Sequence, residues 1–141
     1  MSGHASQTKS VVVERQLPHP PEKIWRALTQ PHLIAEWLMA NDFAPVVDHR
    51  FAFRMEAQPN WNGVIDCRVL EVEPQRTLTY SWGAFGLETV VTWTLRATAA
   101  GTHLRMEHAG FGRDQAQAFA GATHGWQRYL TNLEQVLART E

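Results

Sequence analysis

The stretch "AGATHGWQRYL", residues 120–130, decides the fold because it is the centre of the longest segment with helical periodicity. Its apolar residues continue a pattern from about residue 116 to residue 139, which predicts one long amphipathic helix. The predicted helix has one broad apolar stripe that needs a partner surface. The stripe consists of Phe119, Ala122, Thr123, Trp126, Tyr129, Leu130, Leu133 and Leu137.

Three residues in this stretch are unusual. His124 falls opposite Trp126 on a regular helix, so we expect it to be an ordinary surface histidine. Gly121 and Gly125 lie one turn apart, and each costs roughly 1 kcal/mol relative to alanine in a helix. We interpret the two glycines as sites where a neighbouring loop approaches closely. A local bend that opens the mouth of a cavity is the alternative.

Upstream of this helix the apolar period becomes that of strands. "VVVERQL", residues 11–17, predicts a first strand, and two short helices follow. Pro20 and Pro21 suit the start of the first helix, and Thr29 is expected to cap the second. From residue 43 onward, alternating segments are separated by turn signals such as Asn62-Gly63. The order predicts an α+β fold in which a curved antiparallel sheet wraps around the long C-terminal helix.

Length and composition limit the class of protein. The chain has 141 residues, 44% hydrophobic and 19% charged, which predicts one globular domain over residues 11–141 after a flexible tail over residues 1–10. A net charge of −1 argues against nucleic acid and anionic membranes as partners. The single cysteine, Cys67, and the lack of an apolar leader predict a soluble cytoplasmic protein. The scattered histidines predict no metal site, and no cofactor motif is present.

Four segments in this order resemble a known family. They are "PPEKIWRALTQPHLIAEWL", "VLEVEPQRTLTYSW", "GTHLRMEHAGF" and "HGWQRYLTNLEQVL". The chain resembles, over residues 11–137, bacterial homologues of the activator of the 90-kDa heat-shock-protein ATPase in the START/SRPBCC superfamily. The resemblance implies the helix-grip, birch-pollen-allergen-like fold, with a deep cavity between sheet and helix. It implies no catalytic residues, because the superfamily has no fixed catalytic constellation.

The predicted inward side chains are unusually rich in aromatic rings. Burying so many large rings could fill the interior, or leave an aromatic-walled pocket if the rings do not meet. We take ten residues as candidate ligand-binding residues: Phe51, Phe53, Met55, Tyr80, Trp82, Trp93, Met106, His108, Trp126 and Tyr129. His108 is either a satisfied core histidine, bonded to Tyr80 or a backbone carbonyl, or a group that orients a ligand.

The strand "VIDCRVLEV", residues 64–72, has two faces of similar character. One face contains Cys67 and Glu71, and the other contains Asp66 and Arg68. We prefer Asp66 and Arg68 outside, because an ion pair inside the cavity is costly to bury. Inward Glu71 would then be a buried carboxylate, and a bulge could satisfy both faces.

Three functions fit these observations. The first is a non-enzymatic binder of a small hydrophobic or aromatic molecule, in stress response or resistance. The second, implied by the resemblance, is a co-chaperone-like interaction with a chaperone partner. The third is a polyketide cyclase or hydrolase that uses His108 with Asp66 or Glu71. The protein is expected to be a monomer or homodimer, and the loop aromatics Trp61 and Phe85 could form a dimer patch or a lid.

Overall fold

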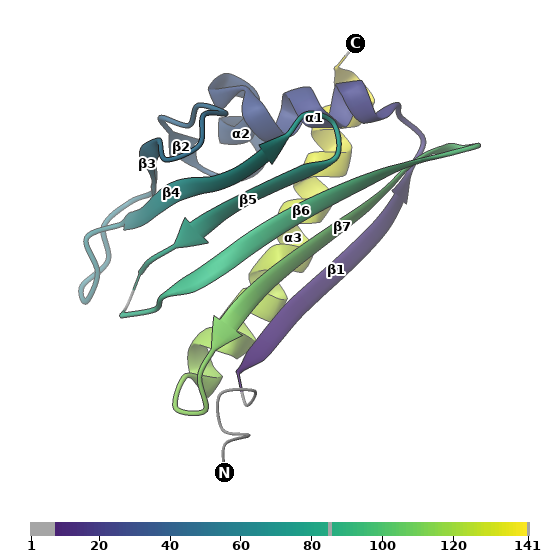
Figure 1. The fold of residues 1–141 in the computed structure, drawn as a ribbon. Coiled ribbons are helices and arrows are strands. Elements are labelled where there is room, and N and C mark those ends of the chain that lie inside the picture. Colours follow the sequence, from purple (N-terminus) through teal and green to yellow (C-terminus); the bar gives the residue numbers. More distant parts are fainter. Residues whose placement is uncertain (1–7, 85, 141) are drawn as a thin grey trace.

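A curved antiparallel sheet holds one long helix against its concave face in the computed structural model (Figure 1). The structure describes residues 8–84 and 86–140. Seven strands lie in the order β1-β7-β6-β5-β4-β3-β2. The elements are β1 (Lys9–Leu17), α1 (Pro21–Thr29), α2 (Pro31–Trp37), β2 (Ala40–Asn41), β3 (Arg50–Arg54), β4 (Val64–Glu73), β5 (Thr77–Trp82), β6 (Thr89–Thr98), β7 (Gly101–Phe111) and α3 (Ala116–Arg139). The predicted helix-grip fold is therefore confirmed.

Proline residues start the two short helices. Pro21 and Pro31 each occupy the first turn of a helix, where a missing N–H costs nothing. The expected capping role of Thr29 is wrong, because Thr29 is still the last residue of α1 and Gln30 precedes α2. The Thr29 hydroxyl donates instead to the Trp25 carbonyl, 2.7 Å away, so it cannot serve α2.

The sheet is built from hairpins, and its two irregularities decide which side chains face inward. The register shifts in β4 between Val69 and Glu71, so Val69 is buried and Glu71 is exposed. Regular alternation before the bulge leaves Asp66 and Arg68 exposed, as preferred, while the bulge turns Glu71 outward, so the buried carboxylate proposed at Glu71 is wrong. The other irregularity lies at the end of β7, where Phe111 opposite Lys9 is buried although it breaks the alternation.

The first and seventh strands meet at one edge of the sheet. β1 pairs with β7 from Lys9 opposite Phe111 to Leu17 opposite Thr102. The predicted tail, residues 1–10, therefore extends two residues too far, because Lys9 and Ser10 belong to β1. Residues 1–7 lie outside the described part of the chain. Gly101 has φ 147°, and a Cβ there would be 2.1 Å from the Leu17 carbonyl oxygen, so the β6–β7 turn requires glycine.

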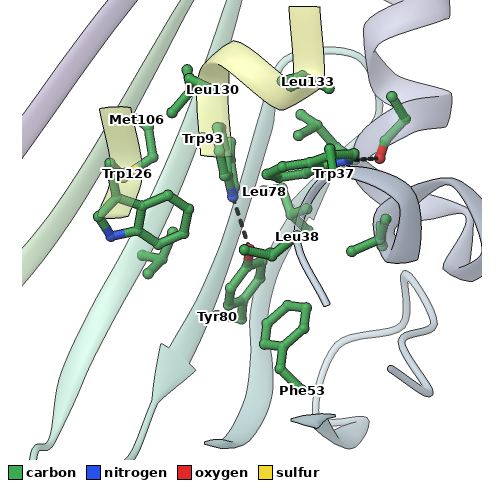
Figure 2. Close-up of a cluster of buried hydrophobic side chains, with 14 of the residues drawn as sticks. Trp37, Leu38, Phe53, Leu78, Tyr80, Trp93, Met106, Trp126, Leu130 and Leu133 are labelled. Atoms are coloured by element: carbon green, nitrogen blue, oxygen red, sulfur yellow. Dashed lines mark hydrogen bonds between the residues drawn. The ribbon is translucent and has the colours of Figure 1, made fainter. Parts of the chain in front are cut away.

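Most of the core lies between the middle of the sheet and the C-terminal half of α3. Figure 2 shows Trp37, Leu78, Trp93, Leu130 and Leu133 gathered in this region, and all five are buried. The Trp37 indole N–H donates to the Ala27 carbonyl oxygen at 2.9 Å, which ties α2 to α1. The apolar stripe of α3 differs from the predicted one at two positions. Thr123 is exposed, and its hydroxyl donates to the Phe119 carbonyl oxygen. Val136, which was not predicted, is buried and belongs to the stripe.

Candidate functional site

A pocket of about 340 Å³ lies between the N-terminal half of α3 and the adjoining end of the sheet. The short helices α1 and α2 cover the opposite end, beside the C-terminal half of α3 (Figure 1). The lining is mostly apolar and comes from α3, from β4, β5 and β7, and from nearby loops. It consists of Met39, Met55, Trp61, Ile65, Trp82, Ala84, Leu87, His108, Phe111, Ala118, Gly121, Ala122, Gly125, Trp126, Arg128 and Tyr129.

Small residues on α3 leave this space open. Ala118, Ala122 and Gly125 are three or four residues apart, so they share one helical face, and Gly121 flanks them. The predicted close approach of a loop to the glycines is wrong. A Cβ at Gly121 would meet no atom of the described residues within 4 Å, and one at Gly125 would meet only the Tyr129 ring among them, at 3.8 Å. The absent side chains therefore contribute to the hollow itself.

A hydrogen-bonded chain of side chains forms part of the pocket wall. The Trp126 indole N–H donates to His108 Nδ1 at 2.9 Å. Because an indole nitrogen only donates, Nδ1 is the acceptor and the neutral imidazole carries its proton on Nε2. His108 Nε2 therefore donates to Thr89 Oγ1 at 2.7 Å, and Thr89 donates to the Trp82 carbonyl oxygen at 2.8 Å. The chain joins α3 to β5, β6 and β7.

His108 is a satisfied core histidine. Burial lowers its pKa from 6.5 to about 4, so the ring is neutral near pH 7. Both ring nitrogens are occupied, by Trp126 and Thr89 and not by Tyr80 or a backbone carbonyl as expected. Asp66 and Glu71 are exposed, and no carboxylate lines the pocket among the described residues. The proposed pairing of His108 with an acid is therefore absent from the described part of the chain.

Two neighbouring residues of α3, Tyr129 and Arg128, lie at the mouth of the pocket. Tyr129 is half-buried, with its ring centroid 5.7 Å from that of Trp126 in an edge-to-face arrangement. The Arg128 guanidinium carbon lies 6.0 Å from the centroid of the Tyr129 ring. Trp126 in turn lies 5.3 Å from Trp82. A line of rings thus leads from the charged rim into the pocket.

Five of the ten predicted ligand-binding residues line the pocket and five do not. Met55, Trp82, His108, Trp126 and Tyr129 are in the lining. A correction applies to the other five, which lie in the packed core: Phe51, Phe53, Tyr80, Trp93 and Met106.

The five core residues are absent from the pocket because their side chains meet one another or neighbouring rings. Phe51 packs 5.3 Å from Phe53 and 5.4 Å from Tyr80, between ring centroids. The Tyr80 hydroxyl accepts a hydrogen bond from the Trp93 indole at 2.9 Å (Figure 2). Burial raises the pKa of Tyr80 above its ordinary value, which keeps the phenol neutral. The predicted filling of the interior by rings is thus correct for this part of it.

Met55 lines the pocket from a loop and not, as expected, from the inward face of a strand. The strand β3 ends at Arg54, so Met55 does not belong to the inward face of a strand and is 43% exposed. Its backbone N–H donates to the Gly63 carbonyl oxygen at 2.9 Å, which holds the residue at the base of the loop. Met55 is therefore a rim residue.

Several lining residues were missed by the sequence reasoning. Phe111 was missed because Gly110, with φ 109°, disturbs the end of β7 and turns Phe111 inward. A glycine inside a strand pattern was the available signal. Trp61, one of the two loop aromatics, is half-buried in the lining, with its indole N–H donating to the Val64 carbonyl oxygen at 3.1 Å. Phe85 lies outside the described residues.

The described residues give little support for a cysteine nucleophile, a metal site or a membrane-spanning helix. Burial raises the pKa of the Cys67 thiol, so it stays protonated and is a poor nucleophile. The described residues contain no group of three His, Cys, Asp or Glu side chains that could hold a metal ion. No described helix is both long enough and apolar enough to span a membrane.

Comparison with solved structures gives the same architecture. A crystal structure of protein MLL2253 from Mesorhizobium loti has 55% sequence identity and a TM-score of 0.87, covering 94% of this chain and 99% of that one. DynU16, described as a putative protein in the dynemicin biosynthetic locus, has 26% identity and a TM-score of 0.79, covering 92% of this chain and 47% of that one. CalU16 from Micromonospora echinospora has 24% identity and a TM-score of 0.77, covering 94% and 78%.

Comparison with sequences identifies the family. No functionally curated protein matches the chain significantly. The sequence profile of the family described as Activator of Hsp90 ATPase homolog 1-like protein matches residues 18–138, which is most of the chain. The chain therefore belongs to the Activator of Hsp90 ATPase homolog 1-like family, within the SRPBCC superfamily.

Proposed function

We propose that this protein binds a small apolar or aromatic molecule in the pocket beside the N-terminal half of α3. The observation that carries the proposal is a hollow of about 340 Å³ lined mainly by carbon. Ligand pockets for small molecules start at about 300 Å³ and are mostly apolar with few polar groups. Burial against Trp82, Phe111 and Trp126 supplies the affinity.

Binding without catalysis fits the polar groups of the wall. His108 has both ring nitrogens engaged by protein partners, so it offers a ligand neither a proton nor a lone pair. No described carboxylate lines the pocket to act with it. A cyclase or hydrolase mechanism through His108 would first have to break the bond to Trp126 or to Thr89.

The test uses N-phenylnaphthylamine, a neutral apolar dye whose fluorescence rises in apolar surroundings. We expect saturable binding to the wild-type protein, and weakening of at least about tenfold in Ala122→Leu and in Gly125→Leu, because each leucine occupies the hollow. Ala120→Leu is the matched control, since Ala120 is exposed on the same helix. It should bind the dye as the wild type does.

Circular dichroism and thermal unfolding establish that each variant is folded before its binding is compared. No saturable dye binding by the wild type would refute the proposal. Equal binding by the folded Ala122→Leu, Gly125→Leu and wild-type proteins would also refute it, because the dye would then bind elsewhere.

A further inference from the structure

Arg128 is the charged residue at the rim of the pocket, and its charge is not neutralised by a described neighbour. Arg15, Arg76 and Arg139 each have a carboxylate oxygen within 3.1 Å. Arg128 has no ion pair or hydrogen bond from its side chain to another residue of the described part, and its contact is with the Tyr129 ring. An unpaired guanidinium beside an apolar pocket is available to a ligand.

The polar groups that remain open around the pocket are mainly donors. The Trp82 indole N–H and the Tyr129 hydroxyl have no hydrogen-bond partner among the described residues, and both line the pocket with Arg128. An indole N–H and a guanidinium can only donate, and a phenol can donate. No described aspartate or glutamate lies in the lining to attract a cation. The site therefore complements an acceptor with negative charge.

The aromatic rings place this charge at one end of the bound molecule. Arg128 lies over Tyr129, Tyr129 packs on Trp126, and Trp126 packs on Trp82, with separations of 6.0, 5.7 and 5.3 Å. A flat molecule that packs along these rings has its outer end beside the guanidinium. The interior end meets mainly carbon, with the Trp82 indole N–H and the engaged His108 as the polar groups there.

We infer that the ligand is an amphiphilic aromatic anion, with its ring system inside the pocket and a carboxylate or similar oxyanion paired with Arg128 at the mouth. This inference rests on the proposed function. It commits the site to a small organic acid and argues against amines and uncharged molecules of the same shape. Tyr129 has the secondary role of donating its hydroxyl to the same head group.

The experiment measures displacement of N-phenylnaphthylamine by naphthoate and by naphthamide, which have nearly the same shape and differ in charge. For the wild-type protein we expect naphthoate to displace the dye at about threefold to fivefold lower concentration, the preference that one solvent-exposed ion pair can give. Arg128→Gln should abolish this preference, which is the ratio of naphthoate to naphthamide displacement within one variant and so does not depend on that variant's affinity for the dye. Arg128→Lys, which keeps the charge, should retain part of it.

Arg96→Gln is the matched control because Arg96 is exposed on the outer face of β6, near the far end of that strand. It changes the net charge equally and should keep the wild-type preference. Added salt should reduce the preference in the wild type and in Arg96→Gln, and should have no effect on the displacement ratio in Arg128→Gln. Equal displacement by naphthoate and naphthamide in the wild type, or an equal loss in Arg96→Gln and Arg128→Gln, would overturn the inference. Failure of the dye itself to bind would instead refute the proposed function.

Discussion

The two halves of α3 face the same sheet, yet one half is packed solid and the other covers a hollow. In the C-terminal half, Leu130, Leu133 and Val136 are at most 1% exposed. In the N-terminal half, the corresponding face carries Ala118 and Ala122, and both line the pocket. The backbone continues as one helix from Ala116 to Arg139. The size of the side chains on one stripe thus separates core from cavity.

The strands beneath the helix show a matching difference. Under the packed half, Trp93 packs edge-to-face against Trp37 of α2, with centroids 5.6 Å apart. Under the hollow half, Trp82 and His108 line the space opposite small residues and have no ring from α1 or α2 above them. The interior of this fold is therefore a core that is incompletely packed at one end. The pocket exists because α3 carries small residues there in place of large side chains.

The largest expected effect on stability comes from shortening one buried side chain in the packed half of α3. Leu133→Ala should lower the free energy of unfolding by about 2 to 5 kcal/mol, because Leu133 is fully buried and its loss removes apolar burial and leaves a cavity. Urea denaturation measures the change. Gln135→Ala, at an exposed position two residues away, should change stability by less than about 0.5 kcal/mol. Similar losses from both substitutions would contradict the solid packing of the C-terminal half.

A slightly smaller effect is expected from pH, through the histidine in the pocket wall. The pKa of His108 is about 4 in the folded protein and near 6.5 in the unfolded chain. The unfolded chain therefore binds a proton first as pH falls, so this contribution is complete above about pH 6.5 and is lost as pH falls toward 4. At about 1.4 kcal/mol per pKa unit, the loss is roughly 3 kcal/mol.

Urea denaturation at several pH values tests this dependence. His108→Gln removes the titrating group and should flatten that part of the profile between pH 4 and 6.5. His124→Gln removes an exposed histidine and should leave the profile as in the wild type. A wild-type stability that is unchanged over this interval would show that His108 is protonated equally in both states.

The smallest effect has the opposite sign and belongs to the hollow half. Gly121→Ala and Gly125→Ala should each raise the free energy of unfolding by about 0.5 to 1 kcal/mol, because alanine restricts the unfolded chain and favours the helix. Within the described part of the chain, the added Cβ has no neighbour within 4 Å at Gly121 and an ordinary contact with Tyr129 at Gly125. Thermal unfolding measures the gain. Destabilisation by either substitution would show that the helix is not free to accept a methyl group there.

The sequence predicted the fold better than the pocket, for a physical reason. Periodicity records which face of an element is apolar, and Trp126 and the β4 residues Ile65 and Cys67 lie inward for that reason. Whether inward rings meet depends on distances between strands that alternation does not record. Phe51 and Tyr80 are therefore core residues, while Trp82, two positions beyond Tyr80 on the same face of β5, lines the pocket.

The parts of the site that sequence reasoning missed are set by irregular backbone and by absent side chains. Gly110 reverses the alternation before Phe111, and β3 ends one residue before Met55. Gly121 and Gly125 gave a signal in their poor helix propensity, but the energetic cost alone did not show whether a loop or a cavity lies beside them. The two hydrogen-bond partners of His108 come from two other elements, Thr89 from β6 and Trp126 from α3, so no local pattern could name them.

The pairing of β1 with β7 has a consequence for synthesis on the ribosome. Val13 pairs with Met106, so the first strand is made long before β7, its neighbour in the described sheet, leaves the exit tunnel. Until then its backbone N–H and C=O groups and its valines have no native partner, which favours adhesion to other nascent chains. The sheet can close only after the chain has been translated past Phe111 and β7 has left the tunnel, so β1 stays unpaired through most of the synthesis of this domain.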